Sequence, residues 1–225
     1  MRRFLFFELT PLANFAIAGI VLNLLLLLWM SVMDAGFLLS IANHVPDSIE
    51  DLLQEKGKDS VYANVSLVAA VVNILSSFLV LKWIYESNKF LQERELPDMR
   101  FEPAYSVLWF FVPVASFYLP YAAMQEIYTG TIALREKDKS AWQEYRKSAY
   151  LLAWWLFLWL PFAYQVSVMF RFGGSEQDAI SFMIDNYWLS PVMAGLRIFE
   201  AVFLLLSIRE IRNAQQEIIR MEQEA

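Results

Sequence analysis

The sequence contains no cysteine and only one histidine, His44. Without thiols the chain cannot form disulfides, thiolate zinc sites or iron–sulfur clusters, and it has no cysteine nucleophile. A single imidazole cannot supply bis-histidine haem ligation or a two-histidine metal site. An enzyme built on this chain would have to rely on carboxylates alone. We therefore expect no cofactor, no metal and no catalytic activity.

Basic residues are also scarce relative to acidic ones. The chain has 18 lysines and arginines against 24 aspartates and glutamates, so its formal net charge is −6. Binding to the phosphates of nucleic acid requires a basic surface, and here the basic residues stand in short clusters beside apolar stretches. Nucleic acid is therefore excluded as a partner.

Apolar residues, in contrast, make up 58% of the chain, which is more than a soluble domain carries. They gather in four segments, each long enough to cross the ~20-residue hydrocarbon core of a bilayer. The predicted spans are about 12–40, 61–85, 148–170 and 189–208. The first follows two arginines as a signal peptide would, but it runs to about Leu39 without a small-residue cleavage site, so we expect it to be retained. The fold class is an all-α integral membrane protein.

A fifth apolar stretch lies between the second and third spans and is interrupted by prolines. Pro103, Pro113 and Pro120 break the stretch at about 103–122. Proline removes a helical hydrogen bond and breaks a helix, and broken backbone at membrane depth must be buried by neighbouring helices or line a wet cavity. We predict a re-entrant or interfacial segment.

The distribution of lysine and arginine distinguishes four spans from five, because these residues are retained in cytoplasmic loops. If the stretch 103–122 enters and leaves on one side, fourteen basic residues are cytoplasmic, three are external and Arg197 lies within a span. If the stretch crosses, seven are cytoplasmic and ten are external. Four spans with both termini cytoplasmic are therefore predicted. The cytoplasmic set is Arg2, Arg3, Lys82, Lys89, Arg94, Arg100, Arg135, Lys137, Lys139, Arg146, Lys147, Arg209, Arg212 and Arg220, and the external set is Lys56, Lys58 and Arg171.

Several connecting segments also have predicted structure. Residues 47–57 are expected to form a short amphipathic surface helix, and helical extensions are expected to follow the second and fourth spans on the cytoplasmic side. The last of these is the tail 209–225, continuous with the span. Ser140 and Gln143 have the spacing of a capping box, which predicts a helix start ahead of the third span. Pro161 should kink that span.

The chain resembles a group of bacterial multi-pass membrane proteins catalogued as a domain of unknown function. The resemblance covers about Val61 to the C-terminus. It rests on Trp83-Ile84-Tyr85 with Asn88, the run W-F-F-V-P that ends at Pro113, the signature P-Y-x-A-M-x-E-I-Y that starts at Pro120, and a glutamine near Gln215. What the resemblance implies is architectural, because this group has no established activity to carry over.

Two groups of residues are candidate sites. The first is an intramembrane polar site with Arg197 and Glu200, three residues apart on one helix face, and Asn73. A charge within the bilayer costs at least ~2.5 kcal/mol, so the pair either binds an anionic or zwitterionic group or relays protons, or else it only neutralises itself and fixes helix packing. Asn73 and Asn23 are more typical of hydrogen bonds between helices.

The second candidate site is the re-entrant segment itself, which contains Trp109, Pro113, Pro120 and Tyr121. Gln125 and Glu126 follow where this segment returns to the interface. They are interpreted either as substrate-facing groups or, the reading we favour, as a solvated helix face. Trp154, Trp155 and Trp159, with Trp109, Phe110 and Phe111, are typical of interfacial anchoring and packing rather than of a cofactor or lipid cage.

These observations favour a non-catalytic membrane module of the bacterial inner membrane that binds lipid or a protein partner, the latter through its cytoplasmic helices. The alternative is a small oligomeric transporter or channel that uses the re-entrant segment and the Arg197/Glu200 pair, since broken half-helices and intramembrane charges are features of transporters. The lipid bilayer is a partner on either hypothesis.

Overall fold

The computed structural model describes residues 2–43, 60–140, 142–171 and 189–224, and every regular element in these ranges is a helix. The expected surface helix at 47–57 and His44 lie outside the described residues. The order along the chain is α1 (Arg2–Asn43), α3 (Ser60–Gln92), α4 (Pro103–Leu108), η1 (Val114–Phe117), α5 (Leu119–Arg135), η2 (Trp142–Glu144), α6 (Ala149–Arg171) and α8 (Leu189–Glu224). The expectation of an all-helical chain is confirmed.

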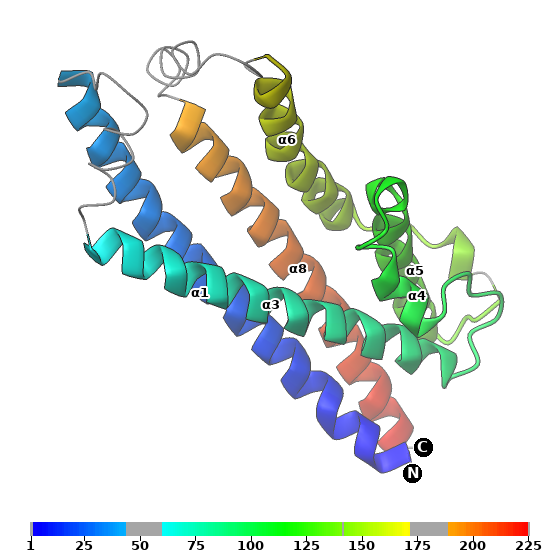
Figure 1. Cartoon of the computed structure of the whole chain (residues 1–225). Coiled ribbons are helices and arrows are strands. Elements are labelled where there is room, and N and C mark those ends of the chain that lie inside the picture. Colours follow the sequence, from blue (N-terminus) through cyan, green and yellow to red (C-terminus); the bar gives the residue numbers. More distant parts are fainter. Residues whose placement is uncertain (1, 44–59, 141, 172–188, 225) are drawn as a thin grey trace.

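Four long helices contain the four predicted spans. Figure 1 shows α8 between α1 and α6, with α3 crossing α1 at a steep angle, and α1 packs against both α3 and α8. Two of these helices are long and apolar enough to cross a membrane over described residues, at Leu9–Gly36 and Ala63–Gln92. With 42 residues in α1 and 33 in α3, both helices exceed the length that a bilayer requires.

The helices alternate in direction, and the two ends of the chain lie at the same end of the bundle (Figure 1). α1 starts at this end, and α3 and α8 finish there, whereas α6 starts about midway along the bundle, beside the hairpin. We call the end that holds both termini the terminal end. The helical extension after the second span is confirmed, since α3 continues to Gln92, and so is the helical tail, since α8 runs without a break to Glu224.

The proline-broken stretch forms a short hairpin at the terminal end. Pro103 opens α4, Pro113 precedes η1, and Pro120 lies in the first turn of α5. A proline in the first helical turn costs nothing, because that N–H has no helical partner and the fixed φ suits a helix. The chain rises through α4, turns at η1 and descends through α5, as Figure 1 shows in green. This path accounts for the spacing of the three prolines.

The buried core lies toward the terminal end. It takes residues from the first half of α1, the second halves of α3 and α8, the start of α6 and nearly all of α5. Between residues 21 and 75, and between 192 and 206, no described side chain is buried. The molecule therefore has a packed end and an end where the long helices present apolar side chains outward.

Candidate functional site

The base of the hairpin is held by Glu126 of α5. Its carboxylate accepts hydrogen bonds from the backbone N–H of Arg100, at 3.1 Å to each oxygen, and from the N–H of Phe101 at 3.1 Å. The Glu126 side chain is buried, with 6% exposed. The favoured interpretation of Gln125 and Glu126 as a solvated face is therefore wrong, because the loop before α4 covers this face of α5.

Burial raises the pKa of Glu126 above 4.5 because the charged carboxylate loses water, and the two N–H groups and the nearby Arg100 offset part of this effect. Asn88 and Gln92 of α3 donate side-chain N–H groups to the carbonyl of Phe101, at 3.1 and 3.3 Å. Both the N–H and the carbonyl group of Phe101 are thus hydrogen-bonded to side chains of α3 or α5. We call Asn88, Gln92 and Glu126 the loop clamp.

Gln125 performs a similar task for the start of α6. Its amide donates to the carbonyl of Ser148 at 2.9 Å and accepts from the Ser148 N–H at 2.9 Å, and it also donates to the Tyr121 hydroxyl at 3.2 Å. The Ser148 hydroxyl in turn accepts from the N–H of Leu151, which is the geometry of an N-cap. Gln125 therefore fixes where the third long helix begins.

The predicted capping box at Ser140 and Gln143 is wrong. Both the N–H and the hydroxyl of Ser140 bond to Asp138, and η2 follows as a single short turn. The helix begins at Ala149 because Ser148 caps it and Gln125 holds Ser148 from outside the helix. A capping pattern within one segment cannot reveal a partner more than twenty residues away.

Tyr128 joins α5 to α8. Its hydroxyl donates to the Glu210 carboxylate at 2.9 Å. Burial and the Glu210 charge raise the pKa of Tyr128 to about 12, so the hydroxyl keeps its proton throughout the physiological range. The sequence named Tyr128 only within the family signature, and Glu210 carried no signal of its own.

Aromatic side chains connect the hairpin to α6. Phe117 stacks on Trp159 at 4.2 Å between ring centroids, and Tyr121 stacks on Trp155 at 6.1 Å. Trp109, which directly follows α4, stacks on Tyr105 of that helix instead. The tip of the hairpin is exposed and apolar, since Val114 is 84% and Phe111 is 67% exposed. The expected aromatic cluster is therefore divided into a packed set on α6 and an exposed tip.

The first candidate site, the intramembrane polar group, lies in the half of the bundle away from the terminal end. Arg197 Nη1 is 4.0 Å from Glu200 Oε2 on the same face of α8. Asn73 does not join this pair: it is exposed on α3, and it makes no hydrogen bond within the described part of the chain. The three residues of the predicted intramembrane site are thus not brought together.

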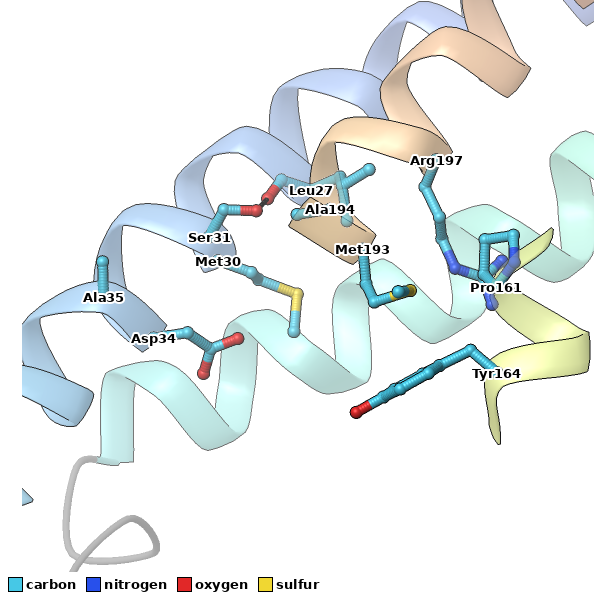
Figure 2. A pocket seen from close by; sticks show the side chains of 10 residues that line it. All are labelled: Leu27, Met30, Ser31, Asp34, Ala35, Pro161, Tyr164, Met193, Ala194 and Arg197. Carbon is cyan, nitrogen blue, oxygen red and sulfur yellow. Dashed lines mark hydrogen bonds between the residues drawn. The ribbon is translucent and has the colours of Figure 1, made fainter. Parts of the chain in front are cut away.

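Arg197 instead lines a pocket of about 330 Å³ between α1, α6 and α8. Figure 2 shows Asp34 and Met30 projecting from α1, Tyr164 from α6, and Arg197 extending from α8 toward Pro161. Among the described residues Arg197 makes no hydrogen bond, and the same holds for the Tyr164 hydroxyl. The lining residues are Leu27, Met30, Ser31, Asp34, Ala35, Pro161, Tyr164, Met193, Ala194 and Arg197.

Sequence reasoning missed most of this pocket. Asp34 was noted only as a charge near the end of the first span, and Tyr164 and Met193 carried no signal. One signal was present: Asp34 and Arg197 are opposite charges within two different apolar segments. Charged residues within membrane segments commonly face the bundle interior or a cavity. The presence of opposite charges in two apolar segments could therefore have indicated a cavity between these segments.

Comparison with family models identifies the family of this chain. Residues 50–213 match the family described as a domain of unknown function (DUF4328), which covers most of the chain, so the chain belongs to this family. The resemblance to a domain of unknown function is thereby confirmed. No curated protein matches, and no solved structure matches.

Proposed function

Starting from membership of a family without a known activity, we propose that this protein is a non-catalytic membrane module that binds lipid or a protein partner. In this proposal α1, α3, α6 and α8 cross the bacterial inner membrane. The hairpin of α4, η1 and α5 enters from the cytoplasmic side and returns to it. Both termini are cytoplasmic.

One observation carries this proposal: the most apolar stretches of α1 and α3 are left almost entirely unburied. Only 11% of the most apolar window of α1 and 6% of that of α3 is buried. A core helix of a soluble protein would be mostly buried, because exposed apolar surface costs roughly 25 cal/mol per Å² in water. A lipid environment removes this cost.

The arrangement of the ends also supports the proposal. The terminal end gathers the N-terminus, the end of α3, both ends of the hairpin and the C-terminus (Figure 1). Together with the segment that leads into α6, these parts of the chain contain the fourteen basic residues counted as cytoplasmic. The α5 arm of the hairpin is largely buried and packs against α3, α6 and α8, and the loop clamp anchors the base of the hairpin, as expected of broken backbone at membrane depth.

Cysteine labelling tests this topology, and the absence of native cysteine makes the experiment clean. Single cysteines at Lys58, Thr131, Lys139 and Gln223 are labelled with a membrane-impermeant maleimide in intact cells and in inverted vesicles. We expect Lys58→Cys to react only from outside, and Lys139→Cys and Gln223→Cys only from the cytoplasmic face. Thr131 is buried, so its variant should react after denaturation only. Labelling of Lys139→Cys in intact cells contradicts four spans.

A second candidate function is a small oligomeric transporter or channel. The pocket with Arg197 favours it, because transporters place charged groups and broken helices beside a cavity in the membrane. Flux of a zwitterionic solute into proteoliposomes, abolished by Arg197→Gln, would favour the transporter over the binding module. If flux into protein-free vesicles equals flux into proteoliposomes, the transporter hypothesis fails and the binding module remains.

A further inference from the structure

We propose that the protein forms a parallel dimer through one face of α3, with the side chains of Asn73 from the two copies hydrogen-bonded to each other. This inference rests on the proposed membrane placement of the helices, and it names the partner that the module would bind, a second copy of this chain. We call the face the Asn73 face, and it consists of Ala63, Ser66, Ala70, Asn73 and Ser77.

The Asn73 side chain has no hydrogen-bond partner at the centre of a predicted span. It lies midway along the span at about 61–85 and within the apolar stretch Ala63–Gln92. The side chain is exposed, and it makes no hydrogen bond within the described part of the chain. A carboxamide has two N–H donors and an acceptor oxygen, none of which an acyl chain can satisfy. Another polar group is therefore expected at this position.

Asn64 shows which feature makes Asn73 unusual. It is also an exposed asparagine of α3, but it lies near the start of the span, where water and lipid headgroups reach its amide. It precedes Asn73 by nine residues, which is two and a half helical turns, so the two side chains point to opposite sides of α3. Only Asn73 combines exposure with a position deep in the bilayer.

The spacing of the Asn73 face suits helix packing. Its residues recur at alternating intervals of three and four, which is the repeat by which two helices pack along each other at a crossing angle of about 20°. Apart from Asn73 they are alanines and serines, and small residues four apart let two membrane helices approach closely. The Ser66 hydroxyl donates to the carbonyl of Ala63 at 2.8 Å, so it needs no outside partner.

The Asn73 face is accessible to a second molecule. Within the chain α3 packs against α1, α4 and α5. Ser76 faces Gly19 of α1, and Asn88 and Gln92 bond to the loop before α4 near the end of the helix. The early part of α3 extends to one side of the bundle beyond its crossing with α1, as Figure 1 shows in cyan. Ala63, Ala70 and Ser77 are exposed there together with Asn73.

The chemistry of the face fits a second copy of the same chain. All copies enter the membrane in one orientation, so the two-fold axis of a dimer runs along the membrane normal, and a residue beside this axis meets its own counterpart. A carboxamide is complementary to itself, because each NH₂ group can donate to the oxygen of the other. The face carries no charged residue that would repel its counterpart.

Sedimentation equilibrium of the full chain in density-matched mild detergent tests the proposal. We expect a monomer–dimer equilibrium for the wild type. Asn73→Leu should raise the dimer dissociation constant about tenfold or more, because two hydrogen bonds between the helices are lost. Asn64→Leu is the matched control: the same substitution on the opposite side of α3 should leave the dissociation constant unchanged.

A second variant keeps the test decisive. Ala70→Leu retains the Asn73 amide but adds bulk where the two helices approach, so it should weaken the dimer as well. Both positions are exposed, and both variants should keep the unfolding temperature of the wild type. A wild type that stays monomeric at every concentration overturns the proposal. A dimer that neither Asn73→Leu nor Ala70→Leu weakens also overturns it.

Disulfide crosslinking in native membranes examines the same face without detergent. The chain has no native cysteine, and a disulfide forms only where two Cα atoms come within about 7 Å. With copper phenanthroline as oxidant, Ala70→Cys should give a crosslinked dimer. Val68→Cys is exposed at a similar depth but on another side of the helix, and it should stay monomeric. Equal crosslinking at both positions, or a crosslink from Ala70→Cys to a different protein alone, contradicts the dimer.

The membrane placement is tested separately by carbonate extraction of membranes. If the chain is released, the proposed function fails, and the reason for Asn73 to seek a partner fails with it. If the chain stays in the membrane and is monomeric, only the dimer is overturned.

Discussion

Two backbone N–H groups of the loop before α4 point at Glu126, and this carboxylate is the anchor of the hairpin. Its three contacts at 3.1 Å are made to residues about 25 positions earlier in the chain. Hydrogen bonds to a charged acceptor are each worth about 1.5–3 kcal/mol, and a buried N–H left unpaired costs about 1–3 kcal/mol. A single side chain therefore accounts for much of the order in this loop.

We predict that Glu126→Gln lowers the free energy of unfolding by about 1–3 kcal/mol near neutral pH. Glutamine keeps the volume but offers one acceptor, and its NH₂ group faces backbone donors. The measurement is thermal unfolding in detergent, followed by tryptophan fluorescence. Glu144→Gln, in the exposed part of η2, is the matched control and should leave the transition unchanged.

The pH dependence of the same variant has a definite sign. Because burial raises the pKa of folded Glu126 above its unfolded value, the folded chain takes up a proton first as pH falls. The free energy of unfolding of the wild type should therefore rise as the pH falls through the folded pKa toward 4.5. The difference between the wild type and Glu126→Gln should widen over this range, and a difference that narrows contradicts the assigned direction.

The sequence could not reveal this anchor. Gln125 and Glu126 are polar residues at the end of an apolar stretch, and such residues usually lie in water. Their partners are backbone groups of Arg100, Phe101 and Ser148, which have no signature in the sequence. Polar side chains that bond backbone across sequence distance can be found only once the fold is known.

At the scale of helices, α1 and α3 approach closely at Gly19. A Cβ at this position would lie 2.6 Å from the Ser76 hydroxyl oxygen and 3.1 Å from its Cβ. Ser76 is buried, and its hydroxyl donates to the carbonyl of Val72 at 2.6 Å, so it has little room to move. Small residues at such a crossing allow two helices to pack closely in a membrane.

We predict that Gly19→Ala destabilises the fold by about 1–3 kcal/mol, because the added methyl group overpacks the crossing. Gly36→Ala is the matched control: it lies on the same helix, and its Cβ would meet nothing within 4 Å. Unfolding temperatures of both variants in detergent provide the measurement. Adding Ser76→Ala to Gly19→Ala should restore part of the loss, and a double variant no better than the single one argues against the crossing as the cause.

Element boundaries were predictable where they depend on local chemistry. The prolines of the hairpin predicted its breaks, and the apolar runs predicted the four long helices. The prediction underestimated the length of α1, which starts at Arg2 and includes Pro11. The capping-box pattern at Ser140 also predicted a helix start ahead of α6, which begins only at Ala149. Both errors arise because packing, rather than local propensity, decides how far a long helix extends.

The whole molecule is polarised between its two ends. The terminal end holds the core, the loop clamp and the bond between Tyr128 and Glu210, whereas the other end exposes apolar faces around the pocket. A bilayer explains this contrast, since hydrocarbon contacts apolar side chains as readily as a protein core does. The packed end would then hold the helices together, and the open end would leave room for lipid.

The tail of α8 belongs to this core rather than projecting freely. Ile211, Ala214, Gln215 and Ile218 are buried, and Arg94 of the loop after α3 makes an ion pair with Glu222 at 2.8 Å. The apolar stripe of the tail therefore already packs within its own chain. A protein partner recruited by the cytoplasmic helices would have to bind another face of these helices.

We predict that deleting residues 209–225 abolishes stable folding rather than only removing a partner. Loss of a single buried isoleucine typically costs 2–5 kcal/mol, and two are removed here together with the Tyr128 partner Glu210. Gel filtration of the detergent-extracted protein should show aggregation for this deletion. Deletion of 223–225, which keeps Glu222, is the control and should give the wild-type peak. A monodisperse 209–225 deletion with an unchanged unfolding temperature would mean that the hairpin and the remaining helices form the core without the tail.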